Sequence, residues 1–325
     1  MVSIVIPMYN VEKVIIRTLK SILEQEIKSY ELIIIDDCSS DNTYDICKNF
    51  IVENKLNNIR LFRNKKNSGP SFTRNRGIDL ATGDYLILFD ADDCYKNGAI
   101  NKMLSNIKKT DLVIIGIDRI YNGKSSILIY NDKNIQKCLK KDLINIYLSG
   151  LLNQPSNKMY NLDIIRKNQI YFDTNSSYGE DLDFNLQYFE KIKNCTIINE
   201  PLYIYYQTKS GLNNIYKKNE LELDRMNFEK KIQYFKSISN LTQEQEKVLY
   251  KNYLIDRFRL YYRFNKYNSY HGKNEYLNKV IMDDNLDELI VKSDISLFNR
   301  KIILTLVKMK FFFTLRVYSK LFLRN

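Results

Sequence analysis

Residues 85–93 read Tyr-Leu-Ile-Leu-Phe-Asp-Ala-Asp-Asp, an apolar run of strand length that ends in three carboxylates. If the run is a buried strand, its acidic end places hard oxygen ligands at one edge of a sheet. Such ligands suit Mg²⁺ or Mn²⁺, ions that proteins commonly share with substrate phosphates. The alternative for an isolated Asp-x-Asp is a solvated acidic turn, so the choice depends on the surrounding sequence.

Around this stretch, apolar runs alternate with segments of helical periodicity. The runs that predict strands are 4–6, 32–35, 59–62, 85–89 and 112–115, with helices predicted between them. This alternation predicts an α/β fold with a doubly wound, mostly parallel sheet and helices on both faces. Ligands of such sheets bind beyond the carboxyl ends of the strands, where Asp36 and Asp37 would lie close to the acidic run.

The pattern changes in the second half of the chain. Two further strands are predicted at 196–198 and 202–206, separated by Pro201. Beyond about residue 215 the sequence becomes helical, charged and rich in tyrosine. We therefore expect an α/β domain over 1–215 and a helical, basic extension over 216–325.

The last segment, 297–325, contains seven Lys or Arg and no Asp or Glu. Its apolar positions form a broad helical face with basic flanks, which is typical of a helix that lies on an anionic membrane surface. A C-terminal helix that docks on its own domain has the same pattern. The sequence leaves both interpretations open.

Composition narrows the class of protein. The 325 residues carry a formal net charge of +12, which indicates an anionic partner: nucleic acid, an acidic membrane or phosphorylated substrates. Five cysteines without paired spacing indicate free thiols in a reducing compartment. The sequence shows no secretory signal and no apolar stretch long enough to span a bilayer.

Several short motifs occur in the order found in family 2 glycosyltransferases, and the chain resembles that family over roughly residues 1–210. The motifs are Pro7-Met8-Tyr9-Asn10, Asp36-Asp37, Asn67-Ser68-Gly69, Arg74-Asn75, Asp90-Ala91-Asp92-Asp93 and Glu180-Asp181. The resemblance implies the GT-A fold. It is strongest to bacterial enzymes that build capsule, exopolysaccharide or wall polymers.

The resemblance implies a nucleotide-sugar site. Tyr9 would stack on the base, Asp37 would accept a hydrogen bond from the uracil ring, and Arg74 would engage phosphate or base. Tyr9 could instead be a core tyrosine, and Asp37 a helix N-cap, although Asp36 has the better claim to that role. The residues assigned to the donor are Pro7, Tyr9, Asn10, Asp37, Asn67, Arg74, Asp90 and Asp92.

The acidic motifs imply the chemistry. Asp90 would hold the ribose, and Asp92 would hold the metal, Mn²⁺ or Mg²⁺, with Asp90 and Asp93 as further candidate ligands, so that charge on the departing UDP is neutralised. Asp181 would be the catalytic base that takes the acceptor hydroxyl proton, and Glu180 would orient it or hold the acceptor. Without the other motifs, this acidic pair would read as a helix N-terminus favoured by the helix dipole.

Other parts of the resemblance are less complete. Lys158 would contact phosphate on the acceptor side, or be an exposed lysine. Tyr203, Tyr205 and Ser210 resemble a stretch that closes over the diphosphate. The only histidine, His271, lies far from the position where some members supply a metal ligand, and the QxxRW motif of processive synthases is missing.

We therefore expect an inverting, metal-dependent enzyme that moves one hexose or N-acetylhexosamine from a UDP-sugar to a lipid-diphosphate-linked saccharide. It would work in the bacterial cytoplasm, held at the anionic inner face of the plasma membrane, with no nucleic-acid partner. One alternative is a sugar-1-phosphate nucleotidyltransferase, which normally has a Gly-rich loop after the first strand. Another is a non-catalytic basic protein that binds nucleic acid or a membrane surface, which would not need carboxylates that repel phosphate.

Overall fold

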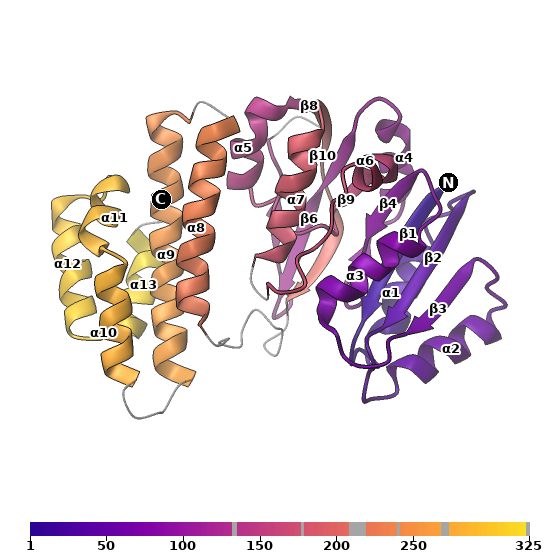
Figure 1. Ribbon diagram of the computed structural model, residues 1–325, viewed down its shortest axis with the longest axis horizontal. Coiled ribbons are helices and arrows are strands. Elements are labelled where there is room, and N and C mark those ends of the chain that lie inside the picture. Colours follow the sequence, from indigo (N-terminus) through magenta and orange to yellow (C-terminus); the bar gives the residue numbers. More distant parts are fainter. Residues whose placement is uncertain (132–134, 177–178, 208–218, 239–240, 268–272, 323–325) are drawn as a thin grey trace. The chain divides into compact units, whose positions relative to one another are not determined.

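The chain forms two compact units, Met1–Thr208 and Lys209–Asn325 (Figure 1). The computed structural model describes residues 1–131, 135–176, 179–207, 219–238, 241–267 and 273–322. The boundary expected near residue 215, Ser210 and His271 lie outside the described residues.

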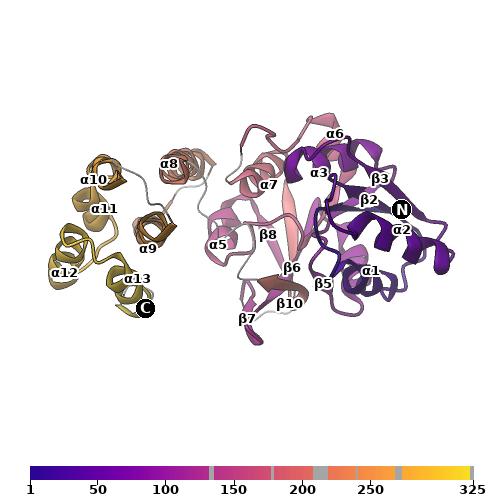
Figure 2. The same ribbon diagram turned by 90° about the horizontal axis from the view of Figure 1, so that it is seen from below.

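The N-terminal unit begins with four parallel strands in the order β3-β2-β1-β4. Helices α3 and α6 cover one face of this part of the sheet, and α1 and α2 cover the other (Figure 2). This confirms the predicted α/β fold. The bounds are β1 (Val2–Met8), α1 (Ile15–Leu23), β2 (Tyr30–Asp36), α2 (Thr43–Glu53), β3 (Ile59–Arg63), α3 (Gly69–Leu80), β4 (Tyr85–Leu88) and α6 (Leu162–Lys167).

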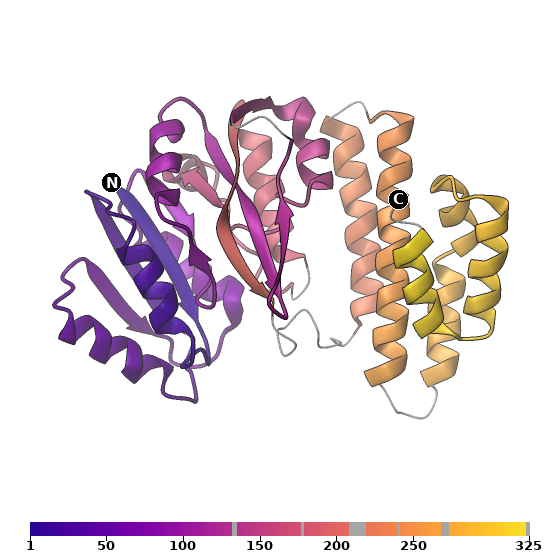
Figure 3. The same ribbon diagram turned by 180° about the vertical axis from the view of Figure 1, so that it is seen from behind.

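The sheet continues with strands of mixed direction. Strand β9 lies antiparallel between β4 and β6, and the long strands β6 and β10 run parallel, side by side in the view from behind (Figure 3). The antiparallel strands differ from the mostly parallel sheet that we expected. The bounds are β5 (Cys94–Tyr95), α4 (Ala99–Ile107), β6 (Leu112–Tyr121), β7 (Lys124–Leu128), β8 (Ile135–Leu139), α5 (Leu143–Leu148), β9 (Lys158–Asn161), α7 (Glu180–Lys191) and β10 (Asn194–Gln207).

Strand β10 corrects one sequence prediction. The two short strands expected on either side of Pro201 are a single strand, which contains both Tyr203 and Tyr205. Its pairing with β6 shifts register on both sides of Pro201. Proline has no N–H to donate, so it is accommodated at this irregularity without ending the ladder.

Close packing of α3 on β1 fixes one wall of the site described below. An ideal Cβ at Gly77 would lie 2.1 Å from Val5 Cγ1, so only glycine lets the helix come this near to the strand. Val5 and its neighbours in β1 are fully buried, as expected for a strand covered on both faces. Arg74 lies one turn earlier on the same helix and is thereby held at the carboxyl edge of the sheet.

The C-terminal unit is built of helices throughout its described residues (Figure 3). Its core gathers apolar side chains from successive helices, among them Leu254, Phe258 and Leu277. The bounds are α8 (Glu220–Ile238), α9 (Gln243–Tyr267), α10 (Lys273–Asp283), α11 (Leu286–Lys292), α12 (Leu297–Lys308) and α13 (Phe312–Phe322).

The expected single tail helix is two helices, α12 and α13, because Lys310 between them adopts a left-handed φ of 58°. Side chains such as Ile303 and Phe312 are buried in the helical core, so part of the tail docks on its own unit. Other large apolar side chains of the tail stay exposed: Leu297, Phe298, Met309, Phe311, Phe313 and Val317. Among the described residues, no helix has the length and apolarity needed to cross a membrane.

Candidate active site

The centre of the site is the buried guanidinium of Arg74, which joins carboxylates from two distant segments. Its Nη2 lies 2.9 Å from Asp90 Oδ1, directly after β4. Its Nη1 lies 3.0 Å from Asp181 Oδ1, in the first turn of α7. One cation therefore brings the predicted base beside the predicted Asp-x-Asp motif, and the contact of Arg74 with a nucleotide stays a prediction.

The electrostatics of this bridge suit proton transfer. Burial raises the pKa of Asp181 to about 6, although Arg74 opposes the shift. The Asp181 side chain still keeps 31% of its surface exposed, so a substrate hydroxyl can reach it. Burial acts to lower the pKa of Arg74, but Asp181 and Asp90 hold it above its ordinary value. The pair is thus a fixed cation beside a carboxyl poised near neutral pH.

Buried hydrogen bonds hold the acidic turn after β4. Asp90 Oδ2 accepts the Ser156 hydroxyl at 2.6 Å. Asp93 is fully buried, and its two oxygens accept the Tyr203 hydroxyl and, at 2.8 Å, the backbone N–H of Tyr206. Burial raises the pKa of Asp93 well above its ordinary value. Asp93 therefore shapes the turn, and its predicted role as a metal ligand stays a prediction.

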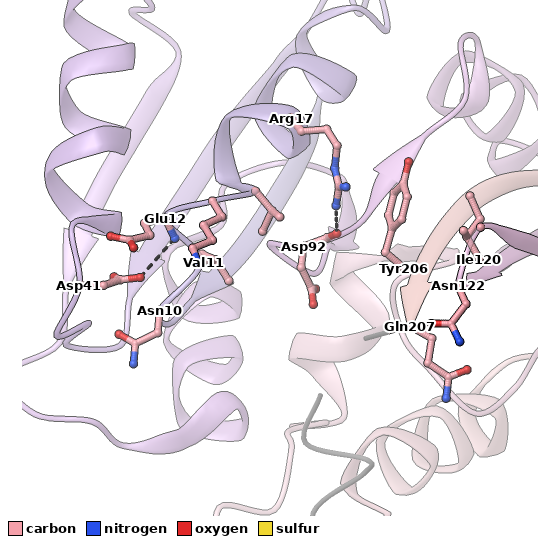
Figure 4. A pocket seen from close by; sticks show the side chains of 13 residues that line it. Asn10, Val11, Glu12, Arg17, Asp41, Asp92, Ile120, Asn122, Tyr206 and Gln207 are labelled. Carbon is pink, nitrogen blue, oxygen red and sulfur yellow. Dashed lines mark hydrogen bonds between the residues drawn. The ribbon is translucent and has the colours of Figure 1, made fainter. Parts of the chain in front are cut away.

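Asp92 lines a cavity of about 550 Å³ in the N-terminal unit. Arg17 Nη2 donates a hydrogen bond of 2.5 Å to the backbone carbonyl of Asp92, and its guanidinium lies 3.8 Å from the ring centroid of Tyr206. The Asp92 carboxylate points away from this hydrogen bond (Figure 4). Burial, and then the charge of Asp90, raise the pKa of Asp92 to about 6. A cation bound here would relieve both effects.

The donor set fits a metal ion that is shared with a ligand. Across the ranges that the structure describes, no group of three or more His, Cys, Asp or Glu side chains is arranged to hold a metal. Mg²⁺ usually keeps several waters and binds through one or two carboxylates together with substrate phosphates. Asp92, with Asp90 beside it, can supply that number of protein ligands.

The structure corrects the expectation that Asp36 caps the helix that follows it, because the N-cap of α2 is Asn42. Asp36 is buried, with Oδ2 at 3.1 Å from Arg63 Nε. Asp37 accepts the backbone N–H groups of Ser68 at 2.9 Å and Gly69 at 2.8 Å, so it caps the start of α3. Asp37 thereby anchors the helix that carries the bridging arginine. A uracil contact at Asp37 stays a prediction.

The other residues assigned to the nucleotide lie at or just beyond the end of β1. Pro7 is within the strand, and Tyr9 follows it with 46% of its surface exposed, so the ring is open to stacking. Asn10 Oδ1 accepts the Ser40 N–H at 2.9 Å and fixes the loop. Asn67 is exposed in the loop before α3. Their contacts with a nucleotide stay predictions.

Lys158 occupies a different place from the acceptor side expected of it. It is fully buried, and its ammonium donates to the carbonyls of Leu151 and Gln154 and to Asn157 Oδ1. Burial holds the pKa of Lys158 well below its ordinary value. Lys158 therefore shapes the loop that delivers Ser156 to the acidic turn. Glu180, the other residue expected on the acceptor side, begins α7 next to the candidate base, and its role stays a prediction.

Sequence reasoning missed two residues of the site, Ser156 and Arg17. Ser156 directly precedes Asn157 and Lys158, but one serine in a loop carries no signal of its own. Arg17 and Lys13 both line the Asp92 cavity. Two cations spaced by four residues, directly after the Tyr9 motif, were a signal that could have indicated a basic wall.

Comparisons with known proteins identify the family and the fold. Residues 3–169 match the family described as Glycosyl transferase family 2. The poly(ribitol-phosphate) beta-N-acetylglucosaminyltransferase TarP of Staphylococcus aureus (strain N315) is 30% identical over 260 residues, 77% of this chain and 74% of TarP.

A second relative is the dolichyl N-acetyl-alpha-D-glucosaminyl phosphate 3-beta-D-2,3-diacetamido-2,3-dideoxy-beta-D-glucuronosyltransferase of Methanococcus voltae. It is 30% identical over 203 residues, 57% of this chain and 60% of the relative. The crystal structure of S. aureus TarS residues 1–349 in complex with UDP-GlcNAc superposes with a TM-score of 0.61 at 20% identity, covering 81% of this chain and 83% of TarS. A likeness at this level of identity shows the fold.

Proposed function

Because this chain belongs to glycosyl transferase family 2 and is a glycosyltransferase, we propose that it moves one hexose or N-acetylhexosamine from a UDP-sugar to a saccharide acceptor carried on a lipid. The transfer inverts the anomeric carbon and serves the synthesis of a surface polysaccharide. The observation that carries this proposal is the Asp90–Arg74–Asp181 bridge, which sets a carboxyl with a pKa of about 6 beside the Asp-x-Asp turn.

The names of the relatives support the finer parts of the proposal. TarS was crystallised in complex with UDP-GlcNAc, which supports a UDP-linked donor. TarP is named a beta-N-acetylglucosaminyltransferase, which agrees with inversion of an α-linked donor. The M. voltae enzyme is named for a dolichyl phosphate acceptor, which supports a lipid carrier. Nothing comparable favours the nucleotidyltransferase or the non-catalytic alternatives.

The chemistry follows from the positions of the side chains. Asp181 would accept the proton of the acceptor hydroxyl while that oxygen attacks the anomeric carbon from the side opposite the leaving diphosphate. Arg74 fixes the Asp181 carboxylate and stabilises the charge of Asp90. Asp92 and Asp90 would hold a divalent ion, Mn²⁺ or Mg²⁺, which neutralises charge on the departing UDP.

We expect UDP to raise the melting temperature of the protein more in the presence of Mn²⁺ than in its absence. A ligand that binds only the native state stabilises it by mass action. Asp92→Asn should remove the metal-dependent part of the shift, because it replaces the proposed ligand. The readout is a thermal melt at fixed UDP with and without Mn²⁺.

Asp163→Asn is the matched control, because Asp163 is exposed on α6 and lines no part of the Asp92 cavity. It should respond to UDP and Mn²⁺ as the natural protein does. A wild-type protein whose UDP response ignores Mn²⁺, or an Asp92→Asn variant with the full response, would count against the metal site.

We also propose that the tail holds the enzyme on an anionic membrane surface. Phe298 and Phe313 are 73% and 63% exposed, on a segment whose charged residues are all basic. Exposed aromatic side chains among Lys and Arg suit the interface of a bilayer that contains anionic lipid. Truncation of the tail is a poor test, because Ile303 and Phe312 belong to the helical core.

Phe298→Ser combined with Phe313→Ser should lower binding to vesicles that contain phosphatidylserine by about tenfold, because two apolar side chains leave the interface. Binding is measured by co-sedimentation, with vesicles of phosphatidylcholine alone as the uncharged reference. Met282→Ser is the control, because Met282 is 79% exposed on α10 of the same unit. If the natural protein, the double variant and Met282→Ser all bind the vesicles equally, the exposed phenylalanines have no role at the membrane.

A further inference from the structure

The C-terminal unit contains a cavity of about 290 Å³ between α8, α9 and α11 that the proposed chemistry does not use. One wall is aromatic. The rings of Phe228 and Tyr253 stack with centroids 3.7 Å apart and planes inclined by 2°, and Tyr250 meets Phe228 edge-on at 5.4 Å. A pocket with flat aromatic faces and a few fixed polar groups is the common form of a small-molecule site.

Two buried polar atoms of residues that line this cavity have no hydrogen-bond partner, the Tyr253 hydroxyl and Asp284 Oδ1. The two carboxylate oxygens of Asp284 differ sharply in their hydrogen bonds, because Oδ1 accepts none and Oδ2 accepts three. Its Oδ2 accepts hydrogen bonds from Arg257 Nε at 3.0 Å, from Arg257 Nη2 at 2.5 Å and from the Tyr261 hydroxyl. Tyr253 and Asp284 are 7% and 5% exposed, so bulk water does not solvate them freely. A buried acceptor without a donor is unfavourable, and a bound group that donates would relieve it.

The surrounding charges limit which ligand can enter. Arg225 and Lys292 line the same cavity and are paired there with Asp283 and Glu288, and the described residues contain no metal-type cluster. The Asp284 carboxylate opposes an anion at its unpartnered oxygen. A purely apolar ligand would leave that oxygen without a donor. A neutral ligand with several hydroxyl groups and one apolar face meets all of these conditions.

We propose that this cavity is a second saccharide subsite, which binds one sugar unit of the acceptor within the C-terminal unit. A sugar hydroxyl donates to Asp284 Oδ1, another pairs with the Tyr253 hydroxyl, and the ring packs on the aromatic wall. The assignment to the acceptor rests on the proposed function. Two linked sites would favour longer acceptors over short ones, because the second contact is intramolecular.

The test uses the full-length protein with its donor site filled by UDP and Mn²⁺. Saturation-transfer NMR and calorimetry measure binding of glucose, N-acetylglucosamine, cellobiose and N,N′-diacetylchitobiose. At least one of these sugars should bind with a Kd of about 1 mM. Tyr253→Phe should weaken that binding about tenfold, because it removes one polar group of the site.

The variants are chosen to separate binding from folding. Tyr253→Phe breaks no hydrogen bond of the folded protein, so its melting temperature should be unchanged or higher. Tyr262→Phe, on the same helix and outside the cavity, should bind sugar as the natural protein does. If no sugar binds, or if binding is the same in Tyr253→Phe, the subsite is wrong.

The outcome is independent of the transfer chemistry. Tyr253→Phe should leave the UDP response intact, whereas a failed donor proposal would remove that response in every variant and leave sugar binding at the cavity unaffected. With a functioning enzyme, Tyr253→Phe should raise KM for long acceptors and leave kcat unchanged, which a merely structural role would not produce.

Discussion

Arg74→Met is expected to destabilise the N-terminal unit by about 3 kcal/mol, because it leaves two partly buried carboxylates without their shared cation. Arg74 lies between Asp90 and Asp181 and is itself almost completely buried. Because methionine keeps much of the volume of arginine, the loss of stability comes from the missing charge and not from a cavity. Chemical denaturation of the variant and the natural protein measures the difference.

Arg76→Met on the same helix is the control. The Arg76 guanidinium is less buried and bonds neutral oxygens, the Arg63 carbonyl and Asn64 Oδ1, so its replacement should cost about 1 kcal/mol. If Arg74→Met loses no more stability than Arg76→Met, the ion pairs of Arg74 with Asp90 and Asp181 do not stabilise the protein as expected.

A double-mutant cycle sharpens this prediction. Asp181→Asn should restore part of the stability lost in Arg74→Met, because it removes one of the two unpaired charges. The deficit should also shrink as pH falls through about 6, where Asp181 takes up a proton. If the stability losses of the two substitutions add strictly, both above and below a pH of about 6, the two side chains do not interact.

The parallel half of the fold could be predicted because its strands are long apolar runs. The strands β1, β2 and β4 have buried stretches rich in Ile, Leu and Val, whereas the edge strand β3 is only half-buried and reads Ile-Arg-Leu-Phe-Arg. Strands β9 and β5 were missed, since four and two residues give no periodicity to detect. The tail was only half predictable, because the same apolar residues can face a membrane or a protein core.

Only part of the candidate site could be predicted from the sequence. Its motifs mark which residues carry charge, so Asp90, Asp92 and Asp181 could be singled out from their types and order. Their pairing through Arg74 could not, because that contact joins segments 107 residues apart and depends on helix packing. Burial also reversed the expectation for Lys158, since sequence alone does not show which lysine is enclosed by carbonyl groups.

Asp181→Asn is expected to lower the rate of sugar transfer by about 10³-fold, the usual size of a general-base effect. Asparagine has almost the same shape and still accepts a hydrogen bond from Arg74, but it cannot take a proton. The site for UDP should be preserved, because asparagine can keep the hydrogen bond from Arg74 Nη1 and leaves the contact of Arg74 Nη2 with Asp90 in place.

The pH profile gives the same base a second signature. The pKa of Asp181 is raised, to about 6, and the active form is the carboxylate. Activity, measured as kcat/KM for the acceptor at saturating donor and metal, should therefore fall as pH drops below about 6 and level off above it. Asp181→Asn should lose this acid limb along with most of its rate.

The most direct test measures transfer and Mn²⁺-dependent UDP binding on one preparation of Asp181→Asn, with Asp183→Asn as control. Asp183 is exposed two residues away, so its variant should resemble the natural enzyme in both measurements. We expect Asp181→Asn to bind UDP normally and to transfer almost no sugar. Retained transfer, or a parallel loss of binding and transfer, would contradict a site in which this carboxylate acts on the acceptor.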